Sequence, residues 1–184
     1  MYDNIINVLK TTLFENRFTH TIGTCESAVV LAAKYSACEE QAYLAALLHD
    51  CARGLNYDET LTYCQENNIE LDEHMKNDFN PVHALVGAHM AKHQFKVEDE
   101  AVIQAILRHA VGCENMTLLD KITFVADAIE PNRDGPDVEE ARQAAERNLD
   151  EAIPLALHVK TRYLRATNSP MHPSSISMLK ELNG

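Results

Sequence analysis

The sequence has almost none of the alternation of Val, Ile, Tyr and Thr with polar residues that marks β-strands. Ala, Leu and Glu dominate its periodic segments instead, and its six glycines and six prolines fall mainly between those segments. These features argue against a sheet protein and predict an all-α fold. A length of 184 residues fits one domain with a substantial core. Because no linker or change of composition divides the chain, we expect a single-domain helical bundle over residues 1–184.

Long apolar runs are also missing. No stretch approaches the ~20 apolar residues that a bilayer-spanning helix requires. The amino terminus, Met1–Ile5, has no basic region followed by an apolar segment, which a secretory leader would have. We therefore expect a cytoplasmic protein with no membrane partner.

Positive charge is scarce, with 16 Lys and Arg against 28 Asp and Glu and a net charge of −12. Such a surface repels nucleic-acid backbones and anionic membranes, so we expect no nucleic-acid partner. If the substrate is anionic, a local cluster of metal and arginine must overcome the global field.

The five cysteines are odd in number and form no CxxC motif. This pattern favours reduced thiols in the core over a disulfide framework or a zinc knuckle.

Residues 44–53 read as a buried helix, because four apolar residues recur at helical spacing: Leu44, Leu47, Leu48 and Cys51. His49 and Asp50 stand side by side near its carboxyl end, and Gly54 is a plausible stop. An imidazole and a carboxylate in such an apolar helix are costly unless something binds them, and a divalent metal would do so. A histidine that caps the helix and an aspartate in a turn explain the same pattern equally well.

The remaining segments extend the helical pattern. We predict a first helix from Asp3 or Asn4 to Phe14, an interruption at Asn16 and Arg17, and a second helix over about 19–36. Further helices are predicted at about 57–67, from Pro81, at 98–109, from the cap Thr117 to 129, from Val138, at 150–165 and at the end of the chain. Polar loops join them at 70–80, 110–116, 130–137 and 168–175.

Nine histidines is a high number for this length. Four of them fall near small or apolar neighbours in different predicted helices: His20, His49, His83 and His109. Asp50 and Asp127 are the acids set into the most apolar helices, where an unpaired carboxylate would be strongly disfavoured. Each histidine alone is more often a core residue than a ligand. Together the six form a mixed nitrogen and oxygen set that suits iron, manganese or zinc.

The order of these residues resembles the HD superfamily of metal-dependent phosphohydrolases. The likeness is closest to the branch of symmetrical diadenosine tetraphosphate hydrolases, and it covers about His20 to Arg142. The runs that carry it are Arg17–Thr21, Leu47–Arg53, Val86–Ala88, Arg108–Gly112, Leu118–Ile122 and Ala126–Arg133. Two positions depart from that pattern: Arg53 stands where the family usually has lysine, and Phe79–Val82 is less typical.

The resemblance implies an HD-type bundle, with a motif-bearing core at about 17–142 and C-terminal helices at about 150–184 packed on it. It implies that metal-bound hydroxide attacks phosphorus and splits diadenosine tetraphosphate symmetrically into two ADP. His20, His49, Asp50 and Asp127 would bind the principal metal. Iron is the first expectation and manganese or zinc the alternatives, with one or two ions.

The resemblance also implies roles around the metal. His83 and His109 would complete a second metal site, with Asp50 as a bridge, or would bind phosphates. Arg53 and Arg133 would bind phosphate. Position and composition suggest further nucleotide contacts at Gly54, Ala110, Pro170, Met171, His172 and Ser174. The expected partners are the nucleotide substrate and ADP as product, and a homodimer is left open.

Two alternatives remain at this stage. The first is an HD phosphohydrolase that acts on nucleoside monophosphates or guanosine alarmones. The second is a non-catalytic sensor that binds metal and nucleotide. A comparison of diadenosine tetraphosphate, dAMP and ppGpp as substrates tests the first. Turnover at background level after anaerobic loading with iron or manganese would favour the second.

Overall fold

A computed structural model of the chain describes residues 2–182, apart from the side chains at positions 163 and 165. Helices provide all the regular secondary structure of this described part, which confirms the all-α prediction. In chain order they are α1 (Tyr2–Thr12), α2 (Glu15–Lys34), α3 (Glu39–Leu48), the 3-10 turn η1 (Cys51–Gly54), α4 (Tyr57–Glu66), α5 (Glu73–Asn77), α6 (Val82–His93), α7 (Glu100–Arg108), α8 (Leu118–Ile129), α9 (Pro136–Ala145), α10 (Leu149–Lys160), α11 (Arg162–Thr167) and α12 (Pro173–Leu182).

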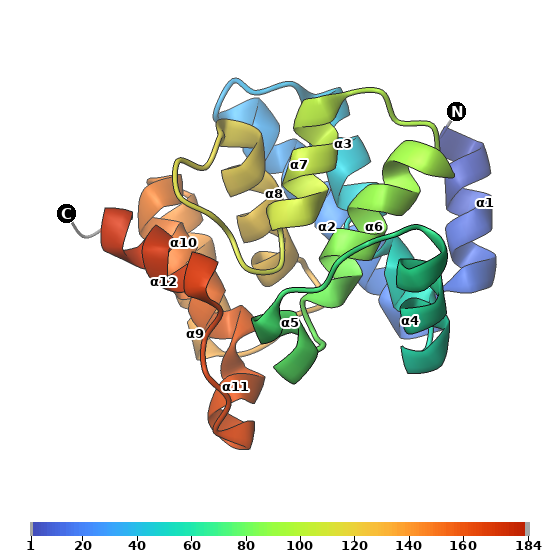
Figure 1. The fold of residues 1–184 in the computed structure, drawn as a ribbon. Helices are drawn as coiled ribbons and strands as arrows, with labels where there is room; N and C mark the ends of the chain where they lie inside the picture. Colours follow the sequence, from blue (N-terminus) through green and yellow to red (C-terminus); the bar gives the residue numbers. More distant parts are fainter. Residues whose placement is uncertain (1, 183–184) are drawn as a thin grey trace.

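Helix α8 lies at the centre of the bundle, in contact with α2, α3, α7, α9 and α10 (Figure 1). Ten of its twelve residues are buried, as expected for a helix that other helices surround. Its first turn is capped reciprocally, as predicted for Thr117. The Thr117 hydroxyl accepts from the Asp120 backbone N–H at 3.2 Å, and the Asp120 carboxylate accepts from the Thr117 N–H at 2.8 Å.

The helix before His49 ends earlier than the sequence predicts. Helix α3 stops at Leu48, His49 is its C-terminal cap, and Asp50 leaves the helical conformation at φ −109° and ψ 15°. The chain then forms η1, where the Arg53 N–H donates to the Asp50 carbonyl at 2.9 Å. This break matters because adjacent residues of a continuous helix diverge by about 100°. The turn instead allows both side chains to reach one centre.

The second predicted helix begins too late. Helix α2 starts at Glu15, directly after the extended residue Phe14, so the predicted interruption at Asn16 and Arg17 is wrong. Arg17 is therefore helical and lies one turn before His20. Residues three apart share a helix face, so both side chains point to the same side of α2.

The C-terminal region also differs in detail. A single helix is predicted at 150–165, but the structure breaks it at Thr161, between α10 and α11. Helix α10 packs on α8 and α9. Helix α12 returns to the loop at 110–116, where the Ser175 hydroxyl donates to the Val111 carbonyl at 2.6 Å. Gly112 has φ +70°, and a Cβ there would overlap the Met178 sulfur.

None of the described helices is long and apolar enough to cross a membrane. All five cysteines lie in the described part and are free thiols. Three of them are buried, in keeping with core thiols: Cys25, Cys51 and Cys64.

Candidate metal centre and phosphate pocket

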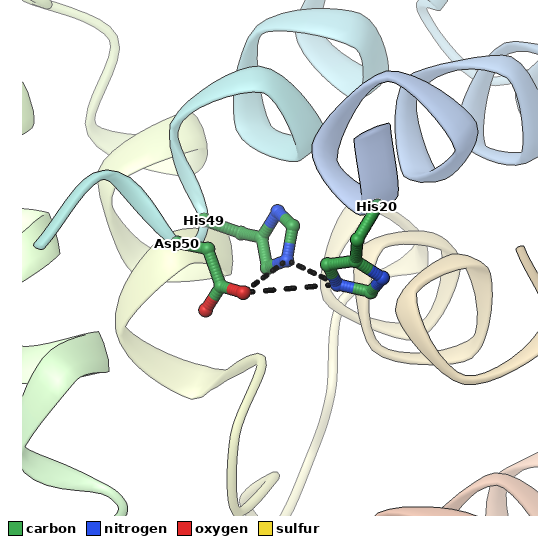
Figure 2. A group of neighbouring side chains, drawn as sticks. All are labelled: His20, His49 and Asp50. Carbon is green, nitrogen blue, oxygen red and sulfur yellow. Dashed lines mark hydrogen bonds and ion pairs between the residues drawn. The ribbon is translucent and has the colours of Figure 1, made fainter. Parts of the chain in front are cut away.

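Three side chains from the first part of the chain meet in the interior (Figure 2). His20 comes from α2, and His49 and Asp50 come from the break between α3 and η1. The Nε2 atoms of His20 and His49 lie 3.2 Å apart. Asp50 Oδ2 lies 3.4 Å from His49 Nε2 and 3.7 Å from His20 Nε2. All three residues are buried.

Helix α8 brings a second carboxylate to the same place. Asp127 Oδ1 lies 3.1 Å from His20 Nε2 and 4.0 Å from His49 Nε2. The structure therefore places together the four residues that the resemblance implies as ligands of the principal metal. We call this group the first end of the site: His20, His49, Asp127 and the Oδ2 atom of Asp50.

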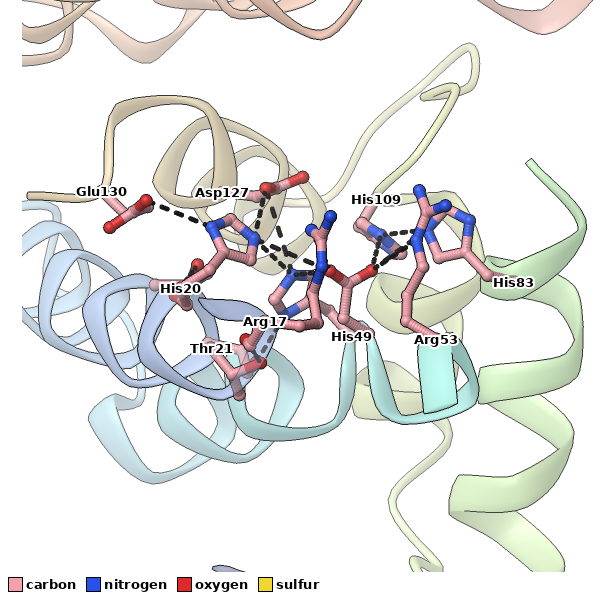
Figure 3. Close-up of polar contacts among 12 residues, drawn as sticks. Arg17, His20, Thr21, His49, Arg53, His83, His109, Asp127 and Glu130 are labelled. Carbon is pink, nitrogen blue, oxygen red and sulfur yellow. Dashed lines mark hydrogen bonds and ion pairs between the residues drawn. The ribbon is translucent and has the colours of Figure 1, made fainter. Parts of the chain in front are cut away.

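The other oxygen of Asp50 faces a second pair of imidazoles. Figure 3 shows the two rings, His83 and His109, next to each other. His83 at the start of α6 and His109 just after α7 approach each other with their Nε2 atoms 3.1 Å apart. Asp50 Oδ1 lies 3.2 Å from His83 Nε2 and 3.8 Å from His109 Nε2. This group is the second end: His83, His109 and the Oδ1 atom of Asp50. The two ends thus share one carboxylate.

Hydrogen bonds on the outer side of each ring determine which nitrogen carries the proton. Three imidazoles have Nδ1 within hydrogen-bond distance of the carbonyl three residues earlier: His49 on Ala46 at 2.6 Å, His83 on Asn80 at 2.5 Å and His109 on Ile106 at 2.7 Å. Only an Nδ1–H can donate to a carbonyl, so Nε2 of each ring is an unprotonated lone pair. His20 Nδ1 lies 3.2 Å from Glu130 Oε1, which gives the same result.

The six candidate ligands therefore present only acceptor atoms to one another. Four Nε2 lone pairs and the two carboxylates Asp50 and Asp127 converge, and their ligand atoms fall into three buried groups in which all lie within 4.8 Å of one another. Lone pairs that face each other at this range repel, and a buried cation among them removes the repulsion. Imidazole and carboxylate donors suit a divalent first-row metal. The residues present fit such an ion.

The charge states of Asp50, Asp127 and His109 match those of metal ligands. Burial raises the pKa of Asp50, but His49 and His83 outweigh burial and hold it well below its usual range. Burial likewise raises the pKa of Asp127, and Lys160 and His20 outweigh it. Burial lowers the pKa of His109 well below its usual value, so this ring is neutral. Ionised carboxylates and neutral imidazoles are the forms that bind metal.

Cationic side chains surround the two carboxylates. Arg17 Nη1 donates to Asp50 Oδ2 at 2.8 Å, and Arg53 Nε lies 3.4 Å from Asp50 Oδ1. Arg133 Nη2 donates to Asp127 Oδ1 at 2.9 Å, and Lys160 donates to Asp127 Oδ2 and, at 3.0 Å, to the His109 carbonyl.

Sequence reasoning found only two of these four cations, Arg53 and Arg133. Arg17 lies within a motif that supports the resemblance, but the local sequence predicts a break between helices at this position. Lys160 stands 33 residues after Asp127, on a helix beyond the motif-bearing core. No local signal distinguishes this lysine from a surface one.

A pocket opens onto the second end of the site. Its walls include Asp50, Asp127, His83, His109 and all four cations, together with Asn80, Asp78, Val111, Thr161, Leu164 and Ser175. Among the predicted nucleotide contacts, Ala110 and His172 line it.

The other predicted nucleotide contacts lie outside this lining. Gly54 lies against α1, where a Cβ would overlap the Thr12 carbonyl. Pro170 is exposed, and Met171 packs against the core. The Ser174 N–H donates to His172 Nδ1 at 3.2 Å, and the next residue, Ser175, is the serine that lines the pocket.

Comparisons with known proteins agree with this geometry. The family described as "HD domain" matches residues 17–132. A protein of Halalkalibacterium halodurans named "Bis(5'-nucleosyl)-tetraphosphatase, symmetrical" is 38% identical, over 96% of this chain and 94% of that protein. A protein of the same name from Bacillus subtilis is 35% identical, over 91% of this chain and 89% of that protein.

A solved structure from Clostridium acetobutylicum, described as a "predicted HD superfamily hydrolase involved in NAD metabolism", superposes with a TM-score of 0.92. It is 33% identical in sequence, and the match covers 100% of this chain and 97% of that one. The predicted HD-type fold is confirmed.

Proposed function

Because this chain belongs to the HD domain family, we propose that it is a metal-dependent hydrolase that splits diadenosine tetraphosphate symmetrically into two ADP. The single observation that carries the proposal is the convergence of four imidazoles and two carboxylates beneath a pocket walled by arginine and lysine. That combination suits a divalent cation and a polyphosphate bound side by side, although the chain carries a net charge of −12.

The reaction consumes one water. The oxygen of the water bonds to a phosphorus beside the central bridge, and the bond from that phosphorus to the bridging oxygen breaks. The products are two ADP and, with both new terminal phosphates ionised, two protons. A bound divalent metal supplies Lewis acidity, which activates water and offsets phosphate charge.

The chain's own residues hold and orient the reactants. His20, His49, Asp50 and Asp127 would hold the principal metal, and His83 and His109 would hold a second ion together with Asp50 or bind a phosphate directly. We assign iron as the first choice of metal and keep manganese and zinc as alternatives.

The four cations bind the phosphate chain. Arg53 and Arg133 were expected in this role, and their ion pairs to Asp50 and Asp127 support it by placing them in the pocket wall. We assign the same role to Arg17 and Lys160, because Arg17 pairs with Asp50 and Lys160 pairs with Asp127. Charge-assisted hydrogen bonds to phosphate contribute about 1.5–3 kcal/mol each, so this ring favours substrates with several phosphates.

We place the two nucleosides of the substrate farther from the metal centre than its phosphates. Ala110 and His172 line the pocket and are the predicted contacts that we retain for base or ribose, with Ser175 in place of Ser174. A cytoplasmic location is a prediction from the sequence.

A substrate comparison tests the proposal. The purified protein is loaded anaerobically with iron or manganese, its metal content is measured, and diadenosine tetraphosphate, dAMP and ppGpp are supplied in parallel. We expect ADP as the sole nucleotide product from diadenosine tetraphosphate. A preference for dAMP or ppGpp would overturn the substrate assignment. Turnover at background level in a metal-loaded sample would favour the sensor alternative.

A further inference from the structure

Glu130 is a fully buried carboxylate directly behind the first end of the site. It is 2% exposed and caps the C-terminus of α8, three residues after Asp127. Its Oε1 atom faces His20 Nδ1 at 3.2 Å. Its Oε2 atom accepts two hydrogen bonds from Asn132, from the backbone N–H at 2.7 Å and from the side-chain amide at 3.0 Å.

This contact makes His20 different from the other three imidazoles. The outer nitrogens of His49, His83 and His109 face neutral backbone carbonyls on their own segments. The outer nitrogen of His20 faces an ionised group from another helix (Figure 3). A carboxylate forms a stronger hydrogen bond than a carbonyl and makes the imidazole a better electron donor at its other nitrogen.

The fold makes room for this carboxylate. Gly23 lies one turn after His20 on α2, and a Cβ at this position would overlap Glu130 Oε2 and lie 2.9 Å from the Asn132 amide. Glycine inside a helix is unfavourable, so its presence under Glu130 indicates a need for close approach. The Glu130 carbonyl is also fixed, because Arg142 Nη2 donates to it at 2.8 Å.

We propose that Glu130 is a positioning residue for the metal centre: it holds His20 in the tautomer that presents Nε2 to the first end and increases metal affinity there, and Gly23 provides the clearance. This inference rests on the proposed metal site.

The charge of Glu130 is central to this role, because three donors surround it. They are His20 Nδ1–H, the Asn132 backbone N–H and the Asn132 amide. A glutamine offers one oxygen. If that oxygen faces Asn132, the glutamine amide faces His20 Nδ1 and favours the opposite tautomer, with the proton on Nε2. Glu130→Gln should therefore damage metal binding at least as much as Glu130→Ala.

The experiment measures metal affinity and the tautomer separately. Mn²⁺ or Zn²⁺ is titrated into the full-length chain against a chromogenic chelator, and nitrogen-resolved NMR of the metal-free protein reports which ring nitrogen of His20 carries the proton. We expect affinity at the first end to fall by about 10- to 100-fold in Glu130→Gln and Glu130→Ala, with loss of the single Nδ1–H form. Gly23→Ala should lower affinity in the same direction.

Matched controls separate this role from a general effect on folding. Glu140→Gln changes an exposed glutamate on α9, and Gly87→Ala adds a Cβ to a helical glycine whose nearest neighbours would lie at 3.5–3.7 Å. Both should keep wild-type affinity. If Glu130→Ala fails to fold, the isosteric Glu130→Gln still decides the matter.

The outcomes also separate this inference from the proposed function. Wild-type affinity and an unchanged His20 tautomer in Glu130→Gln would overturn the role of Glu130 alone. A wild-type protein that binds neither metal would overturn both proposals.

Discussion

The two ends of the histidine cluster share Asp50 but differ in the charge around them. The first end adds Asp127, and behind His20 it adds Glu130. The second end has two imidazoles whose outer nitrogens face backbone carbonyls. The effect is visible in the rings: burial lowers the pKa of His20, but Asp127 and Glu130 outweigh burial and raise it. The pKa of His83 is lowered by burial and by the charge of Arg53.

Access differs as well. His83 and His109 line the pocket, whereas His20 and His49 do not. A site with two carboxylate ligands holds a divalent ion more tightly than a site with one. We therefore expect the first end to retain its metal and the second end to exchange ions or contact phosphate.

The largest effect on both ends is expected for Asp50→Asn, because it removes the carboxylate that the two ends share. We expect metal content to fall at both ends and activity to drop by roughly a thousandfold or more, since several kcal/mol of charge stabilisation are lost. Metal analysis and turnover of diadenosine tetraphosphate measure this. Asp58→Asn, an exposed position on α4, is the control and should match wild type.

Asp127→Ala and His49→Ala remove ligands of the first end only. Each should abolish activity and the tightly bound metal, because the remaining donors no longer surround an ion. Metal analysis after dialysis measures the loss. Undiminished occupancy in Asp127→Ala would refute the assignment of Asp127 as a ligand.

His83→Ala tests whether the two ends bind metal independently. The variant should keep the metal of the first end while activity falls by about 10- to 100-fold, the effect of losing one interaction with a charged group. Metal content per chain and kcat measure the two effects. Complete loss of metal in this variant would show that the ends do not bind independently.

The smallest effect is expected for Arg133→Ala. The variant should retain its metal, because Lys160 still pairs with Asp127, and KM should rise by about tenfold as one charge-assisted contact to phosphate is lost. Arg147→Ala, an exposed arginine paired with Glu151, is the matched control and should leave KM unchanged. A fall in metal content with KM unchanged would mean that Arg133 serves Asp127 rather than the substrate.

Much of the fold could be predicted from local patterns. The central helix α8 is strongly apolar and begins at a threonine cap, and both features are local. Helix boundaries were less predictable where tertiary packing decided them. Arg17 is helical although the local sequence suggested a break, and α3 ends at Leu48 although its apolar pattern continues to Cys51.

The sequence by itself determined which groups are available: four histidines and two aspartates set among apolar neighbours, in an order typical of one superfamily. Only the tertiary structure decided what those groups face. Glu130 meets His20 across 110 residues, and Lys160 meets Asp127 across 33. Such pairings depend on how helices pack against one another, and neither periodicity nor spacing along one helix records them. The physical reason is that the cost of a buried charge is set by its neighbours in space.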